Sequence, residues 1–376
     1  MNILFLNPYD GGSHRAFAQG WREHSRHDLT VLGLPARHWK WRMRHGAITL
    51  AKQAREMSTK FDAVVTTDML DLPCWRSFAP VQLRDLPTVV YFHENQLLYP
   101  DAHKGDRDYH FAFTNLFTAA AASAVWFNSE FHRTGLLAAW QKLLARMPDH
   151  APMDMLAQIA ETSAICYPGI SVSASASASD NAWASAEPPP PCHLLWAARW
   201  EADKAPDAWF AALDQLAETD ARFRVSVLGR ASRHEPELFA SARERLGDRV
   251  VHWGWLESRT EYEAALASAD VVVSTARHEF FGIAVAEAVA AGAFPLVPRR
   301  LAYPELLAEL DEPDCFYEDP RLAERLADLC ARHDRRELWR GDAQRGRRAM
   351  RRYQWKRVAG DMDDRMEAAV ANSAAR

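Results

Sequence analysis

The stretch that decides the fold is Glu279-Phe280-Phe281-Gly282-Ile283-Ala284-Val285-Ala286-Glu287. It follows residues 269–275, Ala-Asp-Val-Val-Val-Ser-Thr, a β-branched run that is typical of a buried strand. It leads into residues 288–291, which are good helix formers, and then into Gly292, a natural helix C-cap. This order predicts a strand, a short loop and the start of a helix.

The loop and the first helical turn have the composition of an anion site. Phe281, Gly282 and Ile283 would present N–H groups at the positive end of the helix dipole, which binds phosphate. Glu287 would lie about 7 Å further along the helix axis, roughly the distance from a diphosphate to a ribose. Glu279 could hold hydroxyls of the group that the diphosphate carries. The stretch therefore indicates a nucleotide-sugar site, although these nine residues alone fit an amphipathic helix with two surface glutamates equally well.

Length and composition predict a globular protein of two domains. The chain has 376 residues, 48% of them hydrophobic, and a formal net charge of −5, which gives no general nucleic-acid signal. Its five cysteines are scattered without metal-ligand spacing, so we expect reduced thiols in a cytoplasmic protein. No apolar run is long enough to span a bilayer, and no membrane partner is expected.

The N-terminal residues predict the opening of a doubly wound domain. Residues 2–7 are predicted to form a strand and residues 13–21 a helix with Ser13 as its N-cap. In such domains ligands bind at the carboxyl ends of the strands. Gly12, in the loop between them, could let the backbone approach a substrate phosphate, although a tight turn explains the glycine equally well.

Polar side chains follow the fourth predicted strand, residues 87–92. His93-Glu94-Asn95-Gln96 come directly after it, at the edge where this architecture places its chemistry. His93 could hydrogen-bond a sugar hydroxyl or a leaving oxygen, whereas a lone histidine is more often structural. Tyr109 opens the next apolar helix and is expected to line the same cleft.

Basic and aromatic side chains alternate without an acid in residues 35–45, which are predicted to form a loop. Arginine and lysine can contact phosphates there, and tryptophan can stack on bases. The other interpretation is a solvated loop whose tryptophans plug an edge of the core. The residues that could contact RNA are Arg37, Trp39, Lys40, Trp41, Arg42 and Arg44.

A second domain is predicted beyond residues 171–191, which alternate serine and alanine and then carry four prolines, as expected of a linker. It opens with a strand at 193–198, and Arg199 and Lys204 lie in the loop that follows. Two cations there can hold a diphosphate and stabilise the charge that grows on it as it departs. Leu256, after a later strand, could present an apolar wall to a base.

The C-terminal residues 335–357 carry ten arginines or lysines against two acids, with Trp339, Tyr353 and Trp355 interleaved. This local asymmetry suits an RNA backbone, and Arg348 and Arg352 are the candidate contacts. The other interpretation is a solvated helix that returns across the first domain, with arginine stems covering apolar surface.

These residues carry a resemblance to known enzymes. The arrangement Arg199…Lys204…Glu279-x7-Glu287, on the second of two Rossmann-like domains, resembles the retaining glycosyltransferases of family 4, which have the GT-B fold of two doubly wound domains facing a central cleft. The N-terminal half is similar, more narrowly, to the tRNA-queuosine mannosyltransferase family. The blocks that suggest this are residues 7–9, 11–14, 35–44, 91–97 and 127–129.

The narrow resemblance implies GDP-mannose as the donor and the cyclopentenediol of queuosine, in the anticodon stem-loop of tRNA(Asp), as the acceptor. It also implies four parts: an acceptor domain at 1–170, the linker at 171–191, a donor domain at 192–345 and a helix at 346–376 that returns to the first domain. The linker departs from the family, because it is longer and less structured than the usual junction.

For the site residues, the resemblance implies transfer with retained configuration and no covalent intermediate. Arg199 and Lys204 would hold the diphosphate, and the departing phosphate oxygen could take the acceptor proton. Glu279 would bind sugar hydroxyls, Glu287 the ribose, and His93 the sugar near the reacting carbon. No metal or other cofactor is expected. The other donor-binding residues would be Gly12, Leu256, Phe280, Phe281, Gly282 and Ile283. The tRNA-binding residues would be Ser13, His14, Arg37, Trp39, Lys40, Trp41, Arg42, Arg44, Glu94, Asn95, Gln96, Tyr109, Arg348 and Arg352.

Two other functions remain open at this point. A glycosyltransferase of the same fold could act on a lipid or a small sugar, which would favour an apolar amphipathic face near residues 35–60 over a basic one. A non-enzymatic RNA-binding protein on the same fold would be expected to have lost Arg199, Lys204 or one of the two glutamates, and all four are present. The residues alone do not separate guanine from uracil donors, or mannose from its epimers.

Overall fold

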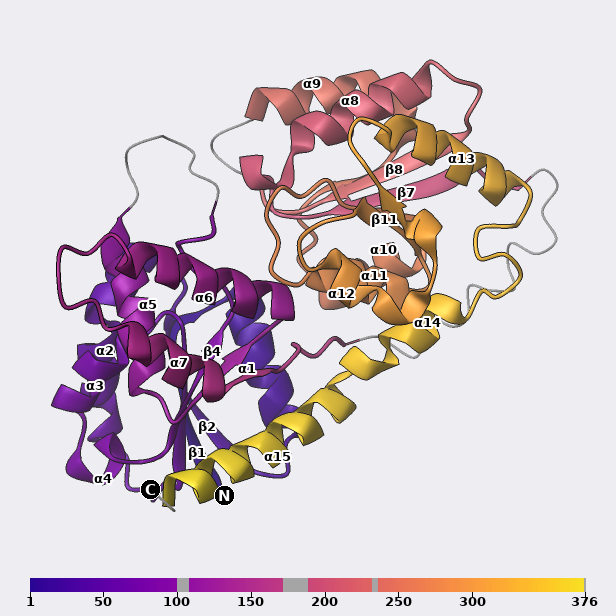
Figure 1. Ribbon diagram of the computed structural model, residues 1–376. Helices are drawn as coiled ribbons and strands as arrows, with labels where there is room; N and C mark the ends of the chain where they lie inside the picture. The colour runs from indigo at the N-terminus through magenta and orange to yellow at the C-terminus, as the bar shows by residue number, and fades with distance from the viewer. Residues whose placement is uncertain (100–107, 172–188, 232–235, 375–376) are drawn as a thin grey trace. The chain divides into compact units, whose positions relative to one another are not determined.

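The chain folds into two units, each built on a six-stranded parallel sheet with helices on its faces (Figure 1). Unit 1 consists of Met1–Gly169 and Trp355–Arg376, and unit 2 is Ile170–Gln354. The structure, a computed structural model, describes residues 1–99, 108–171, 189–231 and 236–374. Most of the predicted linker, residues 172–188, lies outside the described residues. The predicted pair of doubly wound domains is confirmed.

The sheet of unit 1 has the strand order β2-β1-β3-β4-β5-β6, and every neighbouring pair is parallel. The order reverses between β1 and β3, and such a reversal opens a crevice at the carboxyl ends of the strands. The strands are β1 Asn2–Asp10, β2 Asp28–Pro35, β3 Ala63–Thr67, β4 Thr88–Phe92, β5 Ala124–Phe127 and β6 Ser163–Ile165.

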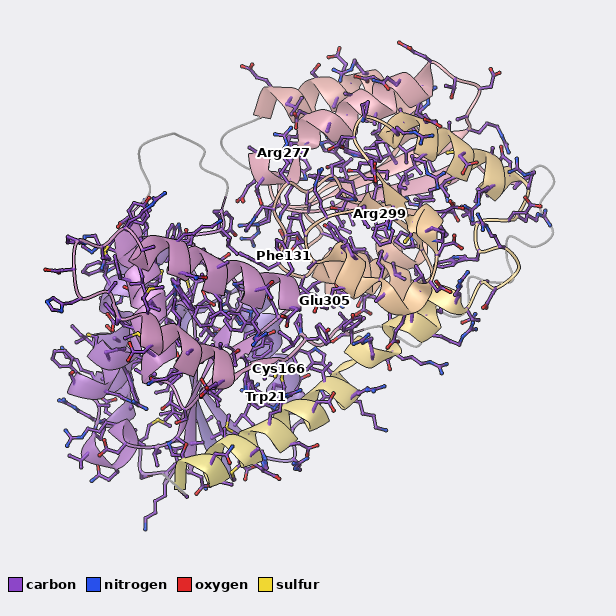
Figure 2. All side chains as sticks on the ribbon, viewed as in Figure 1. Trp21, Phe131, Cys166, Arg277, Arg299 and Glu305 are labelled. Atoms are coloured by element: carbon purple, nitrogen blue, oxygen red, sulfur yellow. The ribbon has the colours of Figure 1, made fainter. Side chains whose placement is uncertain are left out.

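Alternate side chains of these strands enter two different cores. Ile3 and Phe5 of β1 pack with α1 Gly12–His24 and α15 Trp355–Ala374 in a core that includes Trp21 and Cys166 (Figure 2). Leu4 and Leu6 belong to the opposite face, which carries the other helices of unit 1. These are α2 Trp39–Ala54, α3 Leu72–Phe78, α4 Val81–Arg84, α5 Tyr109–Ala121, α6 Glu130–Leu144 and α7 Met153–Glu161.

Helix α2 corrects the prediction of a loop at residues 35–45. The helix begins at Trp39, after His38 in a left-handed conformation (φ 52°). Its buried stripe is Met43, Ala47, Leu50 and Ala54, which recur at helical spacing. The last three pack against the sheet, whereas Met43 packs with Met69 and Phe111. The first turn is basic and aromatic and precedes most of this stripe. Its composition therefore indicated a loop instead of a helix. Ser13 is also not an N-cap: it is the second residue of α1, and Gly11 holds the cap position without a side-chain hydrogen bond.

The sheet of unit 2 has the strand order β12-β11-β10-β7-β8-β9 and is also parallel throughout. Its order reverses between β7 and β10, so these neighbours flank the crevice of this unit. The strands are β7 Cys192–Ala197, β8 Phe223–Leu228, β9 Val250–Gly254, β10 Val271–Val273, β11 Phe294–Pro298 and β12 Phe316–Tyr317. The helices are α8 Pro206–Ala217, α9 Pro236–Leu246, α10 Arg259–Ala267, α11 Ile283–Ala291, α12 Tyr303–Leu306, α13 Leu322–Asp334 and α14 Arg345–Met350.

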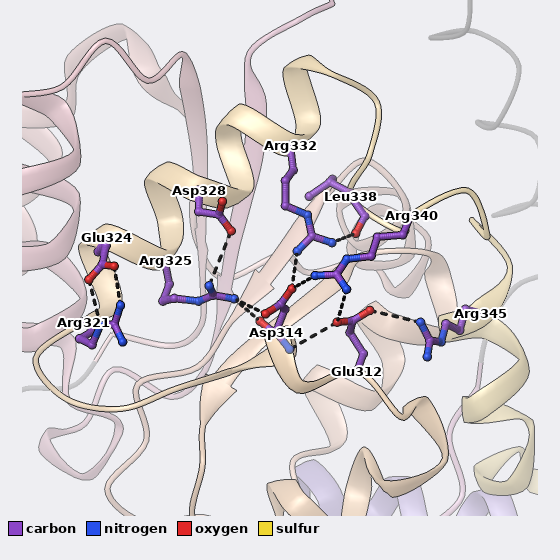
Figure 3. Close-up of polar contacts among 10 residues, drawn as sticks. All are labelled: Glu312, Asp314, Arg321, Glu324, Arg325, Asp328, Arg332, Leu338, Arg340 and Arg345. Carbon is purple, nitrogen blue, oxygen red and sulfur yellow. Dashed lines mark hydrogen bonds and ion pairs between the residues drawn. The ribbon is translucent and has the colours of Figure 1, made fainter.

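An ion-pair cluster organises the C-terminal part of unit 2 (Figure 3). Asp314 accepts from Arg325, Arg332 and Arg340, and the buried Glu312 pairs with Arg345 at 3.2 Å. These arginines come from α13, from the turn after it and from α14. The cluster therefore fastens three segments to the short 3₁₀ helix η5 Pro313–Cys315.

The basic run at 335–357 is not a single helix. It contains a turn, α14, the 3₁₀ helix η6 Arg351–Tyr353 and the start of α15. Because α14 packs against α11 and η6 follows it directly, unit 2 extends to Gln354 rather than ending near residue 345. Helix α15 begins at Trp355, not at residue 346, and belongs to unit 1, where it packs against α1.

No helix in the described ranges is both long and apolar enough to cross a membrane. All five cysteines are free thiols, four of them buried.

One carboxylate ties α15 to α1. Asp363 is buried, and it accepts hydrogen bonds from the indole of Trp21 (2.8 Å), the hydroxyl of Ser25 (2.7 Å) and the backbone N–H of Arg26 (2.9 Å). The neighbouring Asp364 is 72% exposed and makes only a surface ion pair with Arg26 among the described residues.

We expect Asp363→Ala to destabilise unit 1 by about 3 kcal/mol, because three donors lose their acceptor at once. Urea denaturation followed by circular dichroism, with hydrogen exchange of the α1 amides, would measure the loss. Asp364→Ala is the matched control and should change stability little, because both members of the Arg26–Asp364 ion pair are exposed. Equal losses in the two variants would contradict this role of Asp363.

Candidate functional site

Two loops of unit 2 meet at the carboxyl edge of its sheet. The loop after β7 contains Arg199 and the 3₁₀ helix η2 Ala202–Lys204, and the loop after β10 contains Glu279. Because β7 and β10 are neighbours at the point where the strand order reverses, the two loops flank the crevice of this domain. The fold thus brings together Lys204 and Glu279, which are far apart in the sequence.

Lys204 is buried and fully engaged. Its Nζ lies 2.6 Å from the carbonyl oxygen of His278, 3.1 Å from Asp203 Oδ2 and 3.3 Å from Glu279 Oε2. Burial lowers the pKa of Lys204, but the two carboxylates raise it by more, so the net pKa lies above its usual value. Burial likewise raises the pKa of Glu279, and Lys204 with the Phe281 N–H lowers it below its usual value. Both groups are therefore charged at neutral pH.

Glu279 binds one of the three backbone amides that were expected to bind an anion, that of Phe281, together with the amide of Phe280. Its Oε1 accepts from the N–H groups of Phe280 (3.1 Å) and Phe281 (3.4 Å). Gly282 follows with φ 99°, a left-handed conformation that favours glycine, and α11 begins at Ile283. A carboxylate is thus held where amides and a lysine ammonium converge, which is the environment that a diphosphate requires.

Arg199 lies near the start of the loop that follows β7. It is half-exposed and pairs with Glu201 at 3.2 Å. Its charge lies after β7, as predicted, but its guanidinium is less constrained than the Lys204 ammonium.

Glu287 has two partners that the sequence did not indicate. The carboxylate is buried, lies 2.8 Å from Arg259 NH2 and accepts from the hydroxyl of Tyr262 at 3.2 Å. Burial raises the pKa of Glu287, and Arg259 offsets this only in part. Arg259 and Tyr262 lie three residues apart on α10, which packs against α11. Neither residue carried a local signal, because the pairing depends on how the two helices pack.

A cation–π pair lies at the ends of β8 and β9. The guanidinium of Arg230 is 4.7 Å from the ring of Trp255, which is mostly exposed. Leu256, the predicted wall for a base, follows Trp255 and is half-buried. Sequence reasoning located this loop but did not single out Trp255.

In unit 1, His93 and His14 come together at the ends of β4 and β1. Their ring centroids are 4.1 Å apart. Burial lowers the pKa of His14 to about 4, and burial together with the neighbouring histidines lowers the pKa of His93 well below its usual value. Both rings are therefore neutral at pH 7. Within the described residues, His93 Nε2 and His14 Nδ1 are buried without a hydrogen-bond partner, so a polar ligand could bind them.

Asp68 positions His93, and the sequence analysis did not identify it. Its Oδ1 accepts from the His93 backbone N–H at 2.8 Å, while Asn128 donates to the His93 carbonyl at 2.8 Å. Burial and the nearby Glu94 raise the pKa of Asp68 well above its usual value. Asp68 follows the buried strand β3, so the rule that selected His93, a polar residue at a strand end, could have found it as well.

The other residues predicted to line the site of unit 1 are either exposed or hydrogen-bonded within the loop after β4. Gly12 (φ 53°) and Ser13 are exposed at the start of α1, and Tyr109 is exposed at the start of α5. Glu94 accepts from the Tyr99 hydroxyl at 2.8 Å, and the buried Asn95 accepts from the Leu98 N–H at 2.9 Å. Gln96 is half-buried.

The predicted RNA contacts at the start of α2, and just before it, divide into exposed and buried side chains. Arg37, Lys40, Trp41 and Arg44 are exposed. Trp39 packs on Phe111 (ring centroids 5.1 Å apart) with Met43 and Met69, so it does plug an edge of the core. Arg42 is buried and donates to the Pro35 carbonyl at 2.9 Å, which gives it a structural role.

The two arginines chosen from the C-terminal run are both paired with acids. Arg348 contacts Asp342, and Arg352 lies 3.0 Å from Glu309. Among the described residues, no group of three or more histidines, cysteines or acids is placed to hold a metal ion.

Comparisons with known proteins agree with this architecture. Residues 2–170 match the family described as tRNA-queuosine alpha-mannosyltransferase N-terminal, and residues 191–332 match the family described as glycosyl transferases group 1. Among solved structures, Anabaena HepE in complex with UDP superposes with a TM-score of 0.67 at 17% identity, covering 98% of this chain and 100% of that chain. Sucrose-phosphate synthase from Thermosynechococcus elongatus gives a TM-score of 0.65 at 16% identity, with 99% of each chain covered.

A curated relative shares much more of the sequence. The tRNA-queuosine alpha-mannosyltransferase of Drosophila melanogaster is 34% identical over 309 residues, which is 81% of this chain and 81% of that protein. The structural neighbours give the fold, and the sequence relative gives the family. This chain is a glycosyltransferase with the GT-B fold and belongs to the tRNA-queuosine alpha-mannosyltransferase family.

Proposed function

We propose that this protein transfers mannose from GDP-mannose to queuosine in the anticodon of tRNA(Asp), with retained anomeric configuration. The observation that carries the proposal is the buried Lys204–Glu279 pair, set against the Phe280 and Phe281 amides at the strand-order reversal of unit 2. Membership of the family supports the acceptor, and the neutral histidine pair in unit 1 supports sugar binding.

In this proposal the diphosphate of the donor replaces the Glu279 carboxylate at the Phe281 N–H. Lys204 keeps its position because Asp203 and the His278 carbonyl still hold it, and it neutralises the charge of the leaving diphosphate. Arg199 approaches from the half-exposed side of the site. Glu279 is then released to bind hydroxyls of the mannose, and Glu287 binds the ribose.

The reaction then needs no protein base. The bond from C1 of the sugar to the phosphate oxygen breaks, and the bond from C1 to the acceptor oxygen forms on the same face. The acceptor proton moves to the departing phosphate oxygen. His93 is neutral, so it would contact the sugar as a hydrogen-bonding group and not as a cation. No step is routed through a metal.

The partners follow from the same proposal: a nucleotide sugar, a tRNA and no membrane. A tRNA substrate and five free thiols support a cytoplasmic location. The second candidate is a transferase of the same fold that uses a UDP-sugar, since HepE binds UDP in its crystal structure.

A transfer assay tests the proposal. The protein is incubated with GDP-mannose or with UDP-sugars, using tRNA(Asp) that contains queuosine and the same tRNA without it. The tRNA is then digested, and the masses of its nucleosides are measured by mass spectrometry. We expect one added hexose only with GDP-mannose and queuosine-containing tRNA. Transfer from a UDP-sugar, or to unmodified tRNA, would overturn the donor or the acceptor assignment.

Lys204→Met should reduce kcat about 10²–10³-fold, because the leaving diphosphate loses a buried cation. Arg222→Ala is the control: this arginine precedes β8, at the opposite edge of the same sheet, and pairs with Asp334 at 2.7 Å. It should leave kcat unchanged. Circular dichroism would confirm that both variants fold. A Lys204→Met enzyme with a normal kcat would contradict the role given to this lysine.

Glu279→Ala should separate binding from transfer. Transfer should be lost, whereas GDP should bind several-fold more tightly than to the wild type, because the competing carboxylate is gone from the Phe281 N–H and Lys204. Isothermal titration calorimetry with GDP alone measures this. GDP binding that is tenfold weaker in Glu279→Ala would show that the carboxylate does not compete with the diphosphate.

A further inference from the structure

An exposed tryptophan on α2 has no role in the donor site. The Trp41 side chain is 61% exposed, and among the described tryptophans only Trp41 and Trp255 are more exposed than buried. Trp255 has a cation over its ring, but Trp41 has a different neighbour: the ring of His45 lies 4.8 Å away at an interplanar angle of 36°. One face of the indole is thus supported from within the helix, and most of the remaining surface faces solvent.

The supporting ring is itself fixed. Arg42 NH1 lies 2.7 Å from His45 Nε2, and His45 Nδ1 lies 2.9 Å from the Thr49 hydroxyl. A guanidinium can only donate, so Nε2 accepts and Nδ1 carries the proton that it donates to Thr49. Burial and the Arg42 charge lower the pKa of His45, in agreement with a neutral ring. Since Arg42 is anchored on the Pro35 carbonyl, the whole arrangement is set before any ligand arrives.

The charge around Trp41 is strongly positive. No acid occurs between Asp28 and Glu56, and this interval contains Arg37, Lys40, Arg42, Arg44, Lys52 and Arg55. Lys40 and Arg44 are exposed and form no ion pair with any described residue. Lys40 lies 5.6 Å from the centroid of the Trp39 ring, and Arg44 lies 4.8 Å from that of Phe111. The C-terminal basic run differs, because Arg340, Arg345, Arg348 and Arg352 all pair with acids. The surface of α2 is therefore the better phosphate-binding surface.

The position of α2 fits an acceptor in the crevice of unit 1. The helix follows β2, whose carboxyl end lies at the same edge of the sheet as those of β1 and β4. His14 and His93 follow β1 and β4, so Trp41 is at the edge where the sugar-binding histidines lie.

We propose that Trp41 is a stacking platform for an unpaired base of the RNA acceptor, with Lys40 and Arg44 binding the flanking phosphates. This inference rests on the proposed function and adds the surface and the mode by which unit 1 binds RNA. A rigid aromatic face beside cations that no described acid neutralises suits a single-stranded, splayed segment such as an anticodon loop. A protein partner would be expected to cover a larger apolar patch, and on α2, all of whose residues the structure describes, Trp41 is the only exposed large aromatic.

The test measures binding of an anticodon stem-loop of tRNA(Asp) over a series of salt concentrations. Trp41→Ala should weaken binding about tenfold or more, with the same slope of log Kd against log salt, because stacking releases no counterions. Trp41→Phe should retain most of the affinity. The double variant Lys40→Ala, Arg44→Ala should instead reduce the slope by about 1–2, because two phosphate contacts are lost.

Phe117→Ala is the matched control. Phe117 lies on α5 of the same unit, is 46% exposed and has Phe113 behind it, but its helix has no lysine or arginine. It should bind RNA like the wild type. All variants should bind GDP normally, since the donor site is in unit 2.

The outcomes separate this inference from the proposed function. Normal RNA affinity in Trp41→Ala, with transfer to queuosine-containing tRNA intact in the wild type, would overturn the platform and leave the function standing. Weakened RNA binding in Trp41→Ala without mannose transfer by the wild type would support the platform and overturn the function. A wild-type protein that binds anionic vesicles but no stem-loop would overturn both.

Discussion

The proposed donor site depends on one buried ion pair, between Lys204 and Glu279. Removing an ammonium group from water costs several kcal/mol unless partners surround it, and here two carboxylates and a carbonyl oxygen do so. These partners come from two loops that follow different strands. The pair can form only because β7 and β10 are neighbours in the sheet, at the point where the strand order of unit 2 reverses.

The same pair also accounts for the charge balance of the site, because the Lys204 ammonium is matched by the Asp203 and Glu279 carboxylates. The Phe280 and Phe281 amides and the Lys204 ammonium form an environment for anions, and the Glu279 carboxylate satisfies it. Under the proposed function a diphosphate, with its greater charge, would take this place and release Glu279 for the sugar. Unlike Glu279, Glu287 is held by Arg259 and Tyr262 of α10. Its position therefore does not depend on Lys204.

The strands, and the positions of Lys204 and Glu279 in the loops that follow them, could be predicted from the sequence because their signals are local. The Val271–Val273 run and residues Ile3 to Leu6 of β1 are apolar without interruption, and polar residues directly after such strands lie at the carboxyl edge of the sheet. Helix α2 could not be predicted from its first two turns, where tryptophans and arginines outnumber the apolar stripe. His93 was found by the strand-end rule, and Asp68 satisfies the same rule but was not considered.

The remaining differences concern partners that are distant in the sequence. Nothing near Glu287 indicates Arg259, and nothing near Arg345 indicates Glu312, because both pairings follow from how helices pack. For this reason the basic run at 335–357 looked like an RNA surface, whereas several of its arginines neutralise acids within unit 2 (Figure 3). The basic segment at 37–44 has no acidic residue nearby in the sequence, and its assignment as an RNA-binding surface stays a prediction.

A crystal structure of the protein with GDP bound would show whether a diphosphate displaces the Glu279 carboxylate. We expect diphosphate oxygens to accept from the Phe281 N–H and from Lys204 Nζ, with the Glu279 carboxylate moved away from both. A structure in which GDP lies elsewhere in unit 2, while Glu279 still accepts from the Phe280 and Phe281 amides, would contradict this expectation.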